Sequence, residues 1–135
     1  MGYRQQFPAA PSTQTAVVSV ANTNRNGTGT LVTLFTAGQH GSVVSQVDVS
    51  AVGATTDGMI RIFVSDNAST PNVRLLRELP VDTVADPSAS TPAFAGVIDL
   101  RGVGGEPLEI PAGLSLKAST EIGETFHLTA RGSDY

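Results

Sequence analysis

Residues 107–135 read PLEIPAGLSLKASTEIGETFHLTARGSDY, and apolar or small residues alternate with polar ones along most of this stretch. A two-residue period is typical of a β-strand that packs one face on a core. Turn residues interrupt the alternation at Pro111-Ala112-Gly113 and near Ile122-Gly123. The expected core-facing set is Leu114, Leu116, Ala118, Phe126, Leu128 and Ala130, and the expected outward set is Ser115, Lys117, Ser119, Thr125, His127, Thr129 and Arg131. The stretch therefore predicts strands joined by tight turns.

The same kind of segment recurs through the rest of the chain. Short runs rich in Val, Ile, Thr, Phe and Leu lie between Gly, Pro, Asn and Asp residues, which is the pattern of strands separated by turns. The predicted strands are 15–22, 30–37, 43–52, 59–66, 73–81, 93–100, 108–110, 114–119 and 125–131. In the third of these, Val43, Ser45, Val47, Val49 and Ala51 are expected to share a face. No run has the spacing of an amphipathic helix.

The number and spacing of these segments predict an all-β protein. Parallel strands need long, usually helical crossovers, and the sequence has no candidate for them, so the sheets are expected to be antiparallel. About eight strands in two sheets favour a jelly-roll-like β-sandwich, with an immunoglobulin-like sandwich as the alternative. We expect one domain over residues 15–135, preceded by an extended N-terminal arm, residues 1–14.

Composition narrows the possible partners. The 135-residue chain has a net charge of −4, and its eight Lys and Arg residues are scattered. Nucleic-acid binding needs a basic surface, so it is not expected. No apolar run approaches the ~18 residues of a membrane span, and no signal peptide is recognisable, so membrane association is not expected either. Charged residues make up 15% of the chain, against about 25% in a typical domain, which favours a surface covered by a partner.

The residues that usually carry chemistry do not form a recognisable site. His40 and His127 are the only histidines and lie far apart in the sequence, there are no cysteines, and no GxSxG motif is present. Aspartates at the loop tips, in DNAST and DPSAS, offer oxygen ligands for calcium, but Asp in such positions more often forms Asx turns. We therefore expect no catalytic residues, no metal site and no cofactor.

Paired carboxylates were the remaining enzymatic possibility. Glu106, Glu109, Glu121 and Glu124 could supply the two carboxyl groups of a glycosidase. Sugar-binding clefts usually also contain aromatic platforms, and this chain has no Trp, two Tyr and five Phe. The scarcity of aromatic residues counts against both a glycosidase and a carbohydrate-binding module. We expect the protein not to be an enzyme.

The order of several segments resembles a family of small structural proteins of tailed bacteriophages. The resemblance covers about residues 31–135 and rests on FTAGQHGS, GMIRIFVSD, LLRELPV, IPAGLSLKAST and the closing ETFHLTARGSDY. These are hydrophobic-pattern motifs and contain no catalytic signature. Members of the family are commonly labelled capsid decoration, cement or head-stabilising proteins.

The resemblance implies a structural virion protein on the outer capsid surface. Such a protein is made in the cytoplasm of the host bacterium, bridges neighbouring capsomers of the major capsid protein, and is often a homotrimer. The absence of cysteine suits assembly in a reducing cytoplasm. The alternative is a tail or head-fibre module of similar fold that binds a host-surface glycan or receptor.

The N-terminal arm is the predicted partner-binding segment. Tyr3 and Phe7 are the expected aromatic anchors, and Arg4 lies beside them. Pro8 and Pro11 stiffen the arm, which lowers the entropic cost of docking. Strand addition to an exposed sheet edge is the expected mode. The competing interpretation is a leader that contributes little to binding.

Overall fold

The computed structural model describes residues 10–66 and 68–135. This part of the chain contains nine strands and no helix. The strands are β1 (Ala10–Val18), β2 (Val32–Thr36), β3 (Ser42–Ala51), β4 (Gly58–Asp66), β5 (Val73–Val81), β6 (Ala95–Asp99), β7 (Leu108–Ile110), β8 (Leu114–Thr120) and β9 (Phe126–Asp134). The all-β prediction is therefore confirmed.

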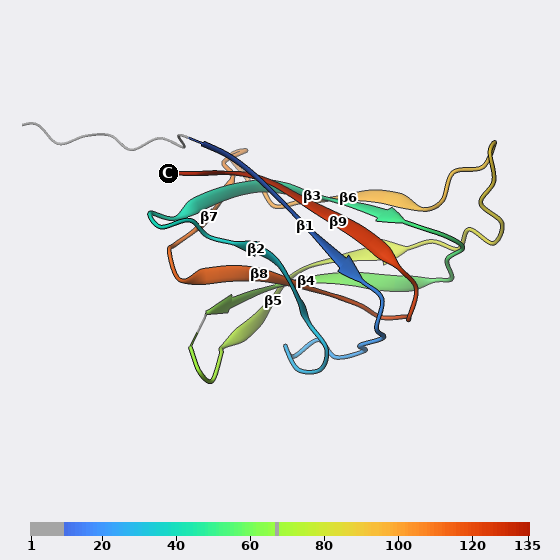
Figure 1. The fold of residues 1–135 in the computed structure, drawn as a ribbon, viewed down its shortest axis with the longest axis horizontal. Coiled ribbons are helices and arrows are strands. Elements are labelled where there is room, and N and C mark those ends of the chain that lie inside the picture. Colours follow the sequence, from blue (N-terminus) through green and yellow to red (C-terminus); the bar gives the residue numbers. More distant parts are fainter. Residues whose placement is uncertain (1–9, 67) are drawn as a thin grey trace, which may run out of the picture.

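The strands form two antiparallel sheets packed face to face. The five-stranded sheet has the order β1-β9-β3-β6, with the short β7 also paired to β3. The four-stranded sheet has the order β2-β8-β4-β5. In Figure 1 the five-stranded sheet lies above the four-stranded sheet, and β1 runs alongside β9. This arrangement confirms the predicted β-sandwich.

The strand pairings are nested one inside the next. β1 pairs with β9, β2 with β8, β3 with β6 and β7, and β4 with β5. The additional pairs β3–β9 and β4–β8 join this folded-over ribbon into its two sheets. Antiparallel strands that pair from the outside inward and alternate between two sheets form a jelly roll. The jelly-roll-like prediction is therefore confirmed.

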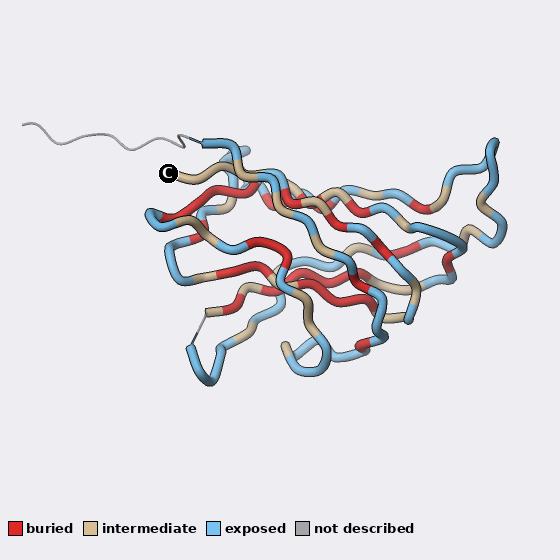
Figure 2. The backbone as a smooth tube through the Cα atoms, in the orientation of Figure 1, coloured by how far each residue is buried: buried red, intermediate tan, exposed pale blue. Residues whose placement is uncertain are grey.

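The core lies between the sheets and contains the alternate residues of the central strands. Leu116, Ala118, Leu128 and Ala130 are fully buried, as the alternation in residues 107–135 predicts, and Leu114 packs against the core from a half-buried position. Figure 2 shows the buried positions along the strands of both sheets, with the loops at the ends mostly exposed. The hydrophobic effect of this single core holds the sandwich together.

The connection between β1 and β2 adds a second layer on the four-stranded sheet. Ala21 forms an isolated bridge with Thr120, and the backbone N–H of Asn22 donates to the Thr120 carbonyl at 2.8 Å. Further along, Gly27 adopts a φ of 85° and lies so close to β5 that a Cβ there would come within 2.8 Å of the Val73 Cβ. Residues 19–31 therefore cover part of the outer face of this sheet.

The boundary between the arm and the sandwich lies earlier than the sequence pattern suggests. β1 begins at Ala10, and residues 10–14, which were assigned to the arm, pair with β9 in register. Exposed and partly buried residues alternate along APSTQTAVV from near its beginning, but the first valine is Val17. The hydrophobic pattern therefore identifies only the second half of this strand. Residues 1–9 lie outside the described part of the chain.

Candidate partner-binding surfaces

The predicted arm residues are divided between the described and the undescribed parts of the chain. Tyr3, Arg4, Phe7 and Pro8 lie outside the described residues. Pro11 is exposed in β1, where it pairs with Ser133 of β9. The described structure thus contains the base of the arm but not its predicted anchors.

The outer face of the five-stranded sheet is broad and nearly uncharged at its centre. Two rows of residues cross it from β1 to β6 in register: Thr15, Thr129, Asp48 and Val97 in one row, and Val17, His127, Ser50 and Ala95 in the other. Val17 is 52% exposed and Val97 is 54% exposed. We call these eight positions the upper face.

The one charge on the upper face is neutralised within the same sheet. The Arg131 guanidinium lies 2.5 Å from Asp48 Oδ2, and the Gln46 side-chain amide donates to Asp48 Oδ1 at 2.8 Å. Partial burial of Asp48 acts in the opposite direction, but the hydrogen bonds from Arg131 and Gln46 hold the pKa of this carboxyl below its usual value. The carboxylate remains ionised at neutral pH, and the adjacent Arg131 neutralises this single charge of the upper face.

Partner-binding surfaces of proteins are depleted in charge at their centres, while scattered exposed valines are common on any protein. The upper face differs from a scattered set because its small apolar and hydroxyl side chains are contiguous over four strands. His127 was predicted on the polar side of its strand, and it is exposed there, between Val17 and Ser50. This surface suits a flat partner better than a small ligand.

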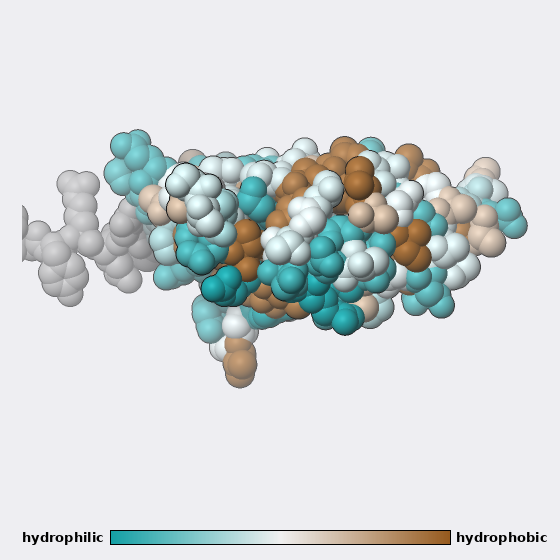
Figure 3. All heavy atoms as spheres, turned by 90° about the horizontal axis from the view of Figure 1, so that it is seen from below, coloured by the Kyte–Doolittle hydropathy of each residue, from teal (hydrophilic) through white to brown (hydrophobic). Residues whose placement is uncertain are grey.

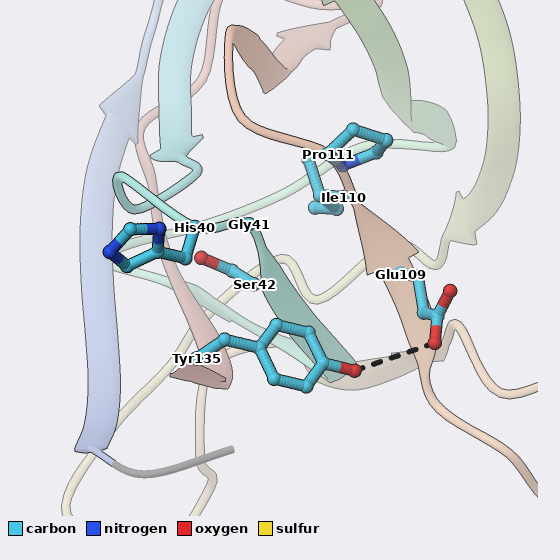
Figure 4. Close-up of a pocket in the computed structure, with 7 residues that line it drawn as sticks. All are labelled: His40, Gly41, Ser42, Glu109, Ile110, Pro111 and Tyr135. Carbon is cyan, nitrogen blue, oxygen red and sulfur yellow. Dashed lines mark hydrogen bonds between the residues drawn. The ribbon is translucent and has the colours of Figure 1, made fainter. Parts of the chain in front are cut away.

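A shallow pocket of about 350 Å³ lies at the end of the sandwich from which β1 starts. It is lined by the turn at His40 and Gly41, by the start of β3, by β7, and by Tyr135. In Figure 4 the Tyr135 ring lies across the pocket with its hydroxyl directed at Glu109, to which it donates at 3.4 Å. His40 lies on the other side of the ring.

Hydrogen bonds hold this pocket in place. The Tyr135 N–H donates to the Gly41 carbonyl at 3.1 Å, and the Ser42 hydroxyl donates to Asp134 Oδ1 while accepting from the Gly38 N–H. Burial and the negative charge of Glu109 raise the pKa of the Tyr135 phenol. The phenol therefore stays protonated at neutral pH and can donate a hydrogen bond. Sequence reasoning missed this pocket because its residues come from three distant segments.

A cluster of four charged side chains lies beneath the 19–31 connection. Arg61 of β4 is only 2% exposed, and its Nε donates to Glu78 Oε2 at 2.8 Å, while its Nη2 lies 2.5 Å from Glu121 Oε2. Arg25, from the connection, also binds Glu78 at 2.8 Å. Two guanidinium groups and two carboxylates make this cluster neutral, and it ties the connection to β4 and β5.

The aspartates Asp66 and Asp57 accept hydrogen bonds from loop residues. Asp66 Oδ1 accepts hydrogen bonds from the N–H groups of Ala68 and Asn72, and Asp57 Oδ1 accepts from the N–H and hydroxyl of Thr83. Hydrogen bonds from the Asn72 backbone and side chain hold the pKa of Asp66 below its usual value. The Asp66 contacts are those of a turn-forming aspartate, whereas Asp57 links the β3–β4 loop to the β5–β6 loop. Within 10–66 and 68–135, no group of three or more His, Cys, Asp or Glu residues is arranged to hold a metal ion.

Figure 3 shows the molecule from below the view of Figure 1, on the side of the four-stranded sheet, where hydrophilic residues are interspersed with separate hydrophobic patches. Among the described residues no helix is long and apolar enough to cross a membrane. Comparison with known proteins finds no family model that matches the chain and no similar sequence among the curated proteins. Function is therefore inferred from the sequence resemblance and from the surfaces of the molecule.

Proposed function

We propose that this protein is a structural virion protein of a tailed bacteriophage, a capsid decoration or cement protein on the outer capsid surface. It bridges neighbouring capsomers of the major capsid protein and stabilises the head against the pressure of the packaged genome. The upper face is the observation that carries this proposal, because a contiguous surface without net charge on a rigid sandwich suits a large, flat protein partner. The segment resemblance to phage head proteins supports it independently.

In this role the protein stabilises the head only by the surface area that it buries against the capsomers, without any catalysed reaction. Each copy covers a junction between capsomers, and a homotrimer on a three-fold position does so with closed symmetry. The nested pairings favour this role because each central strand is held on both sides, which makes the domain stiff. A stiff domain loses little conformational entropy on docking, so more of the contact energy remains as affinity.

The test places a charge on the upper face. Val97→Arg introduces a guanidinium at an exposed position of β6, and Val103→Arg introduces the same group at an exposed position of the β6–β7 loop, outside the eight positions of the upper face. Both proteins are added to purified capsids of the encoding phage that lack the protein, and occupancy is measured from the bound fraction. We expect V97R to bind about tenfold more weakly, equivalent to ~1.4 kcal/mol, and V103R to bind like the wild type. Equal binding by all three proteins would refute the upper face as the capsid contact.

The second candidate is a tail or head-fibre module that binds a host-surface glycan or receptor. The pocket beside Tyr135 favours it, because the aromatic ring can stack on a sugar while the neighbouring carboxylate accepts hydrogen bonds from the sugar hydroxyl groups. Tyr135→Ala removes the ring, and Glu106→Ala removes an exposed carboxylate outside the pocket as a control. Saturable glycan binding by the wild type and E106A, lost in Y135A and accompanied by no capsid binding, would favour this candidate over the cement protein.

A further inference from the structure

β1 is an edge strand whose free side is long and uncharged. It pairs with β9 through all nine of its residues without a register shift, and no other described strand pairs with it. Its sequence, APSTQTAVV, contains no charged residue. Proteins usually protect such an edge by charge, proline, a bulge or a short strand, because its free N–H and C=O groups bind other strands.

The other edges of the described sandwich have these protections. β5 carries Arg74, Arg77, Glu78 and Pro80, and its pairing with β4 shifts register between Ile62 and Phe63. β2 and β6 have five residues each, and the pairing of β2 with β8 is also irregular. Pro11, near the start of β1, is the only such feature on its edge. β1 is thus the edge best suited to accept another strand.

The hydrogen-bonding pattern identifies the free groups. The Val52 N–H donates to the Thr125 carbonyl, and the Tyr135 N–H donates to Gly41, so odd-numbered residues along β9 direct their backbone groups toward β3. Antiparallel ladders alternate, so even-numbered residues of β9 face β1, where their partners are also even-numbered. The N–H groups of Thr13, Thr15 and Val17 therefore point to the free edge.

A small gap lined by both valine and hydroxyl side chains lies beside this edge, on the side of the sandwich where β1 and β2 meet. A cavity of about 50 Å³ there is lined by Val18, Val20, Val32 and Ala118, among other residues. Val20 is exposed, and Val32 packs against the core while remaining only partly buried. An apolar side chain from an added strand would extend the core at this point.

We propose that the free edge of β1 binds residues 1–9 of a second copy of this chain as an added strand. The segment has nine residues, the same number as β1. It directly precedes Ala10, which pairs with Asp134, the last residue of β9. The segment is therefore joined directly to a strand whose free side has no partner among the described strands.

The sequence of the segment fits this edge. In MGYRQQFPA, one alternate set contains Met1, Tyr3, Phe7 and Ala9 with Gln5, and the other contains Gly2, Arg4, Gln6 and Pro8. Such alternation is typical of a strand with one apolar face. Arg4 is its only charged side chain, so it matches the uncharged edge. Backbone pairing would supply affinity, and Tyr3 and Phe7 would supply specificity.

The segment leaves from β1 and the acceptor edge is β1, so each copy both donates and accepts. Two copies exchanging segments form a closed dimer, and successive donation around a ring forms a closed trimer. The inference goes beyond the proposed function and does not depend on it, because it concerns contacts between copies of this chain in solution. The contact between copies can therefore be disproved while capsid binding is confirmed, and capsid binding can be disproved while the contact between copies is confirmed.

The first experiment measures the mass of the full chain and of a variant lacking residues 1–9 by light scattering on a size-exclusion column. We expect the full chain to be a dimer or trimer and the shortened chain to be a monomer. A labelled peptide of residues 1–9 is then titrated into the shortened chain. A peptide with Tyr3→Ser and Phe7→Ser is expected to bind at least about tenfold more weakly than the unchanged peptide. The matched control peptide, with Arg4→Ser and Gln6→Ser, alters the other alternate set of side chains and is expected to keep most of the affinity.

The second experiment locates the contact by amide hydrogen exchange in the shortened chain. The free-edge amides of Thr13, Thr15 and Val17 are expected to exchange quickly and to become at least about tenfold slower when the unlabelled peptide is added, while amides of β5 stay unchanged. A monomeric full chain, an oligomer that survives removal of residues 1–9, or protection at β5 in place of β1 would overturn the proposal.

Discussion

At the scale of single residues, Arg61 has an environment that needs explanation. Its side chain is on the outer face of the four-stranded sheet, yet it is as buried as the core because residues 19–31 cover it. A buried guanidinium is stable only when carboxylates and carbonyls replace its water. Glu78, Glu121 and the Asn22 carbonyl, which accepts from Nη1 at 3.4 Å, provide these partners.

Replacement of Arg61 tests this account. Arg61→Met keeps most of the side-chain volume but leaves Glu121 without its guanidinium partner, so we expect the free energy of unfolding in urea to fall by about 2–3 kcal/mol. This is below the roughly 3–5 kcal/mol of a fully buried pair because both carboxylates are partly exposed. The control, Arg101→Met, removes an exposed pair with Asp99 and should cost at most about 0.5 kcal/mol. Equal losses in both variants would contradict the buried role of Arg61.

The same cluster predicts a pH dependence. Hydrogen bonds from Arg25 and Arg61 lower the pKa of Glu78 in the folded protein, whereas in the unfolded chain it is about 4.3. Its contribution to stability is therefore present above about pH 4.3 and is lost as the pH falls through the folded value. We expect the stability difference between the wild type and Glu78→Gln to be constant from pH 7 to 5 and to shrink below pH 4.3, as followed by urea unfolding. A difference that grows in acid would reverse the assigned sign.

At the scale of elements, β9 is an inner strand of its sheet, with β1 on one side and β3 on the other. Its pairing with β3 shifts register between Val44 and Gln46, next to Gly132. A Cβ at Gly132 would collide with the Val43 carbonyl oxygen and approach the Phe35 ring at 3.2 Å. The bulge and the glycine together let β3 and β9 approach closely at this point.

A methyl group at this position is therefore expected to strain both strands. Gly132→Ala should lower the free energy of unfolding by more than about 2 kcal/mol, because neither backbone can move without disturbing the ladder. Gly53→Ala is the matched control, since an added Cβ there meets nothing within 4 Å, and its effect should stay within about 0.5 kcal/mol. Thermal and urea unfolding of both variants measure the contrast. A mild effect at Gly132 would show that the strands have room to adjust.

These elements also show how far the sequence pattern reaches. Alternation correctly placed Leu116, Ala118 and Leu128 in the core, because each faces the opposite sheet. Alternation also predicts that Val43 and Ser45 share a face with Val47. The bulge instead places Val44 in the core with Val47, because a two-residue period contains no signal for an inserted residue. Ser119 was expected to face solvent, yet it is buried next to the cavity that Ser19 and Thr30 also line, because alternation does not reveal a covering loop.

The candidate surfaces were predictable to different extents. The outward position of His127 follows from the pattern of its strand, but the rows of the upper face depend on which strands are neighbours, and that order is set by long-range pairing. The pocket at Tyr135 combines segments that are about 25 and 95 residues away from the C-terminus, and its only sequence signal was a tyrosine in a chain with few aromatic residues. The predicted anchors Tyr3 and Phe7 stay predictions.

At the scale of the whole molecule, the nested topology places the first and the last strand of the sandwich side by side. Ala10 pairs with Asp134, so the outermost strands in the sequence are neighbours in one sheet. The loop 85–92, by contrast, is largely exposed and lies between β5 and β6, far from both ends of the sequence. Stability depends on which strands pair and not on the order of the strands along the chain. The present ends can therefore be joined and new ends opened in an exposed loop without loss of a strand pairing.

A circular permutant tests the nested pairing directly. Tyr135 is joined to Ala10 by a short Gly-Ser linker, and new ends are opened within 85–92. We expect cooperative unfolding, with a stability within about 2 kcal/mol of a chain that lacks only residues 1–9, because every sheet pairing is kept and the linker adds little loop entropy. The matched permutant, opened between Ile62 and Phe63 inside β4, cuts a strand that pairs with both β5 and β8, so it should not fold cooperatively. If both permutants folded equally well, the pairings of β4 would not be essential; if both failed, the pairing of Ala10 with Asp134 would be wrong.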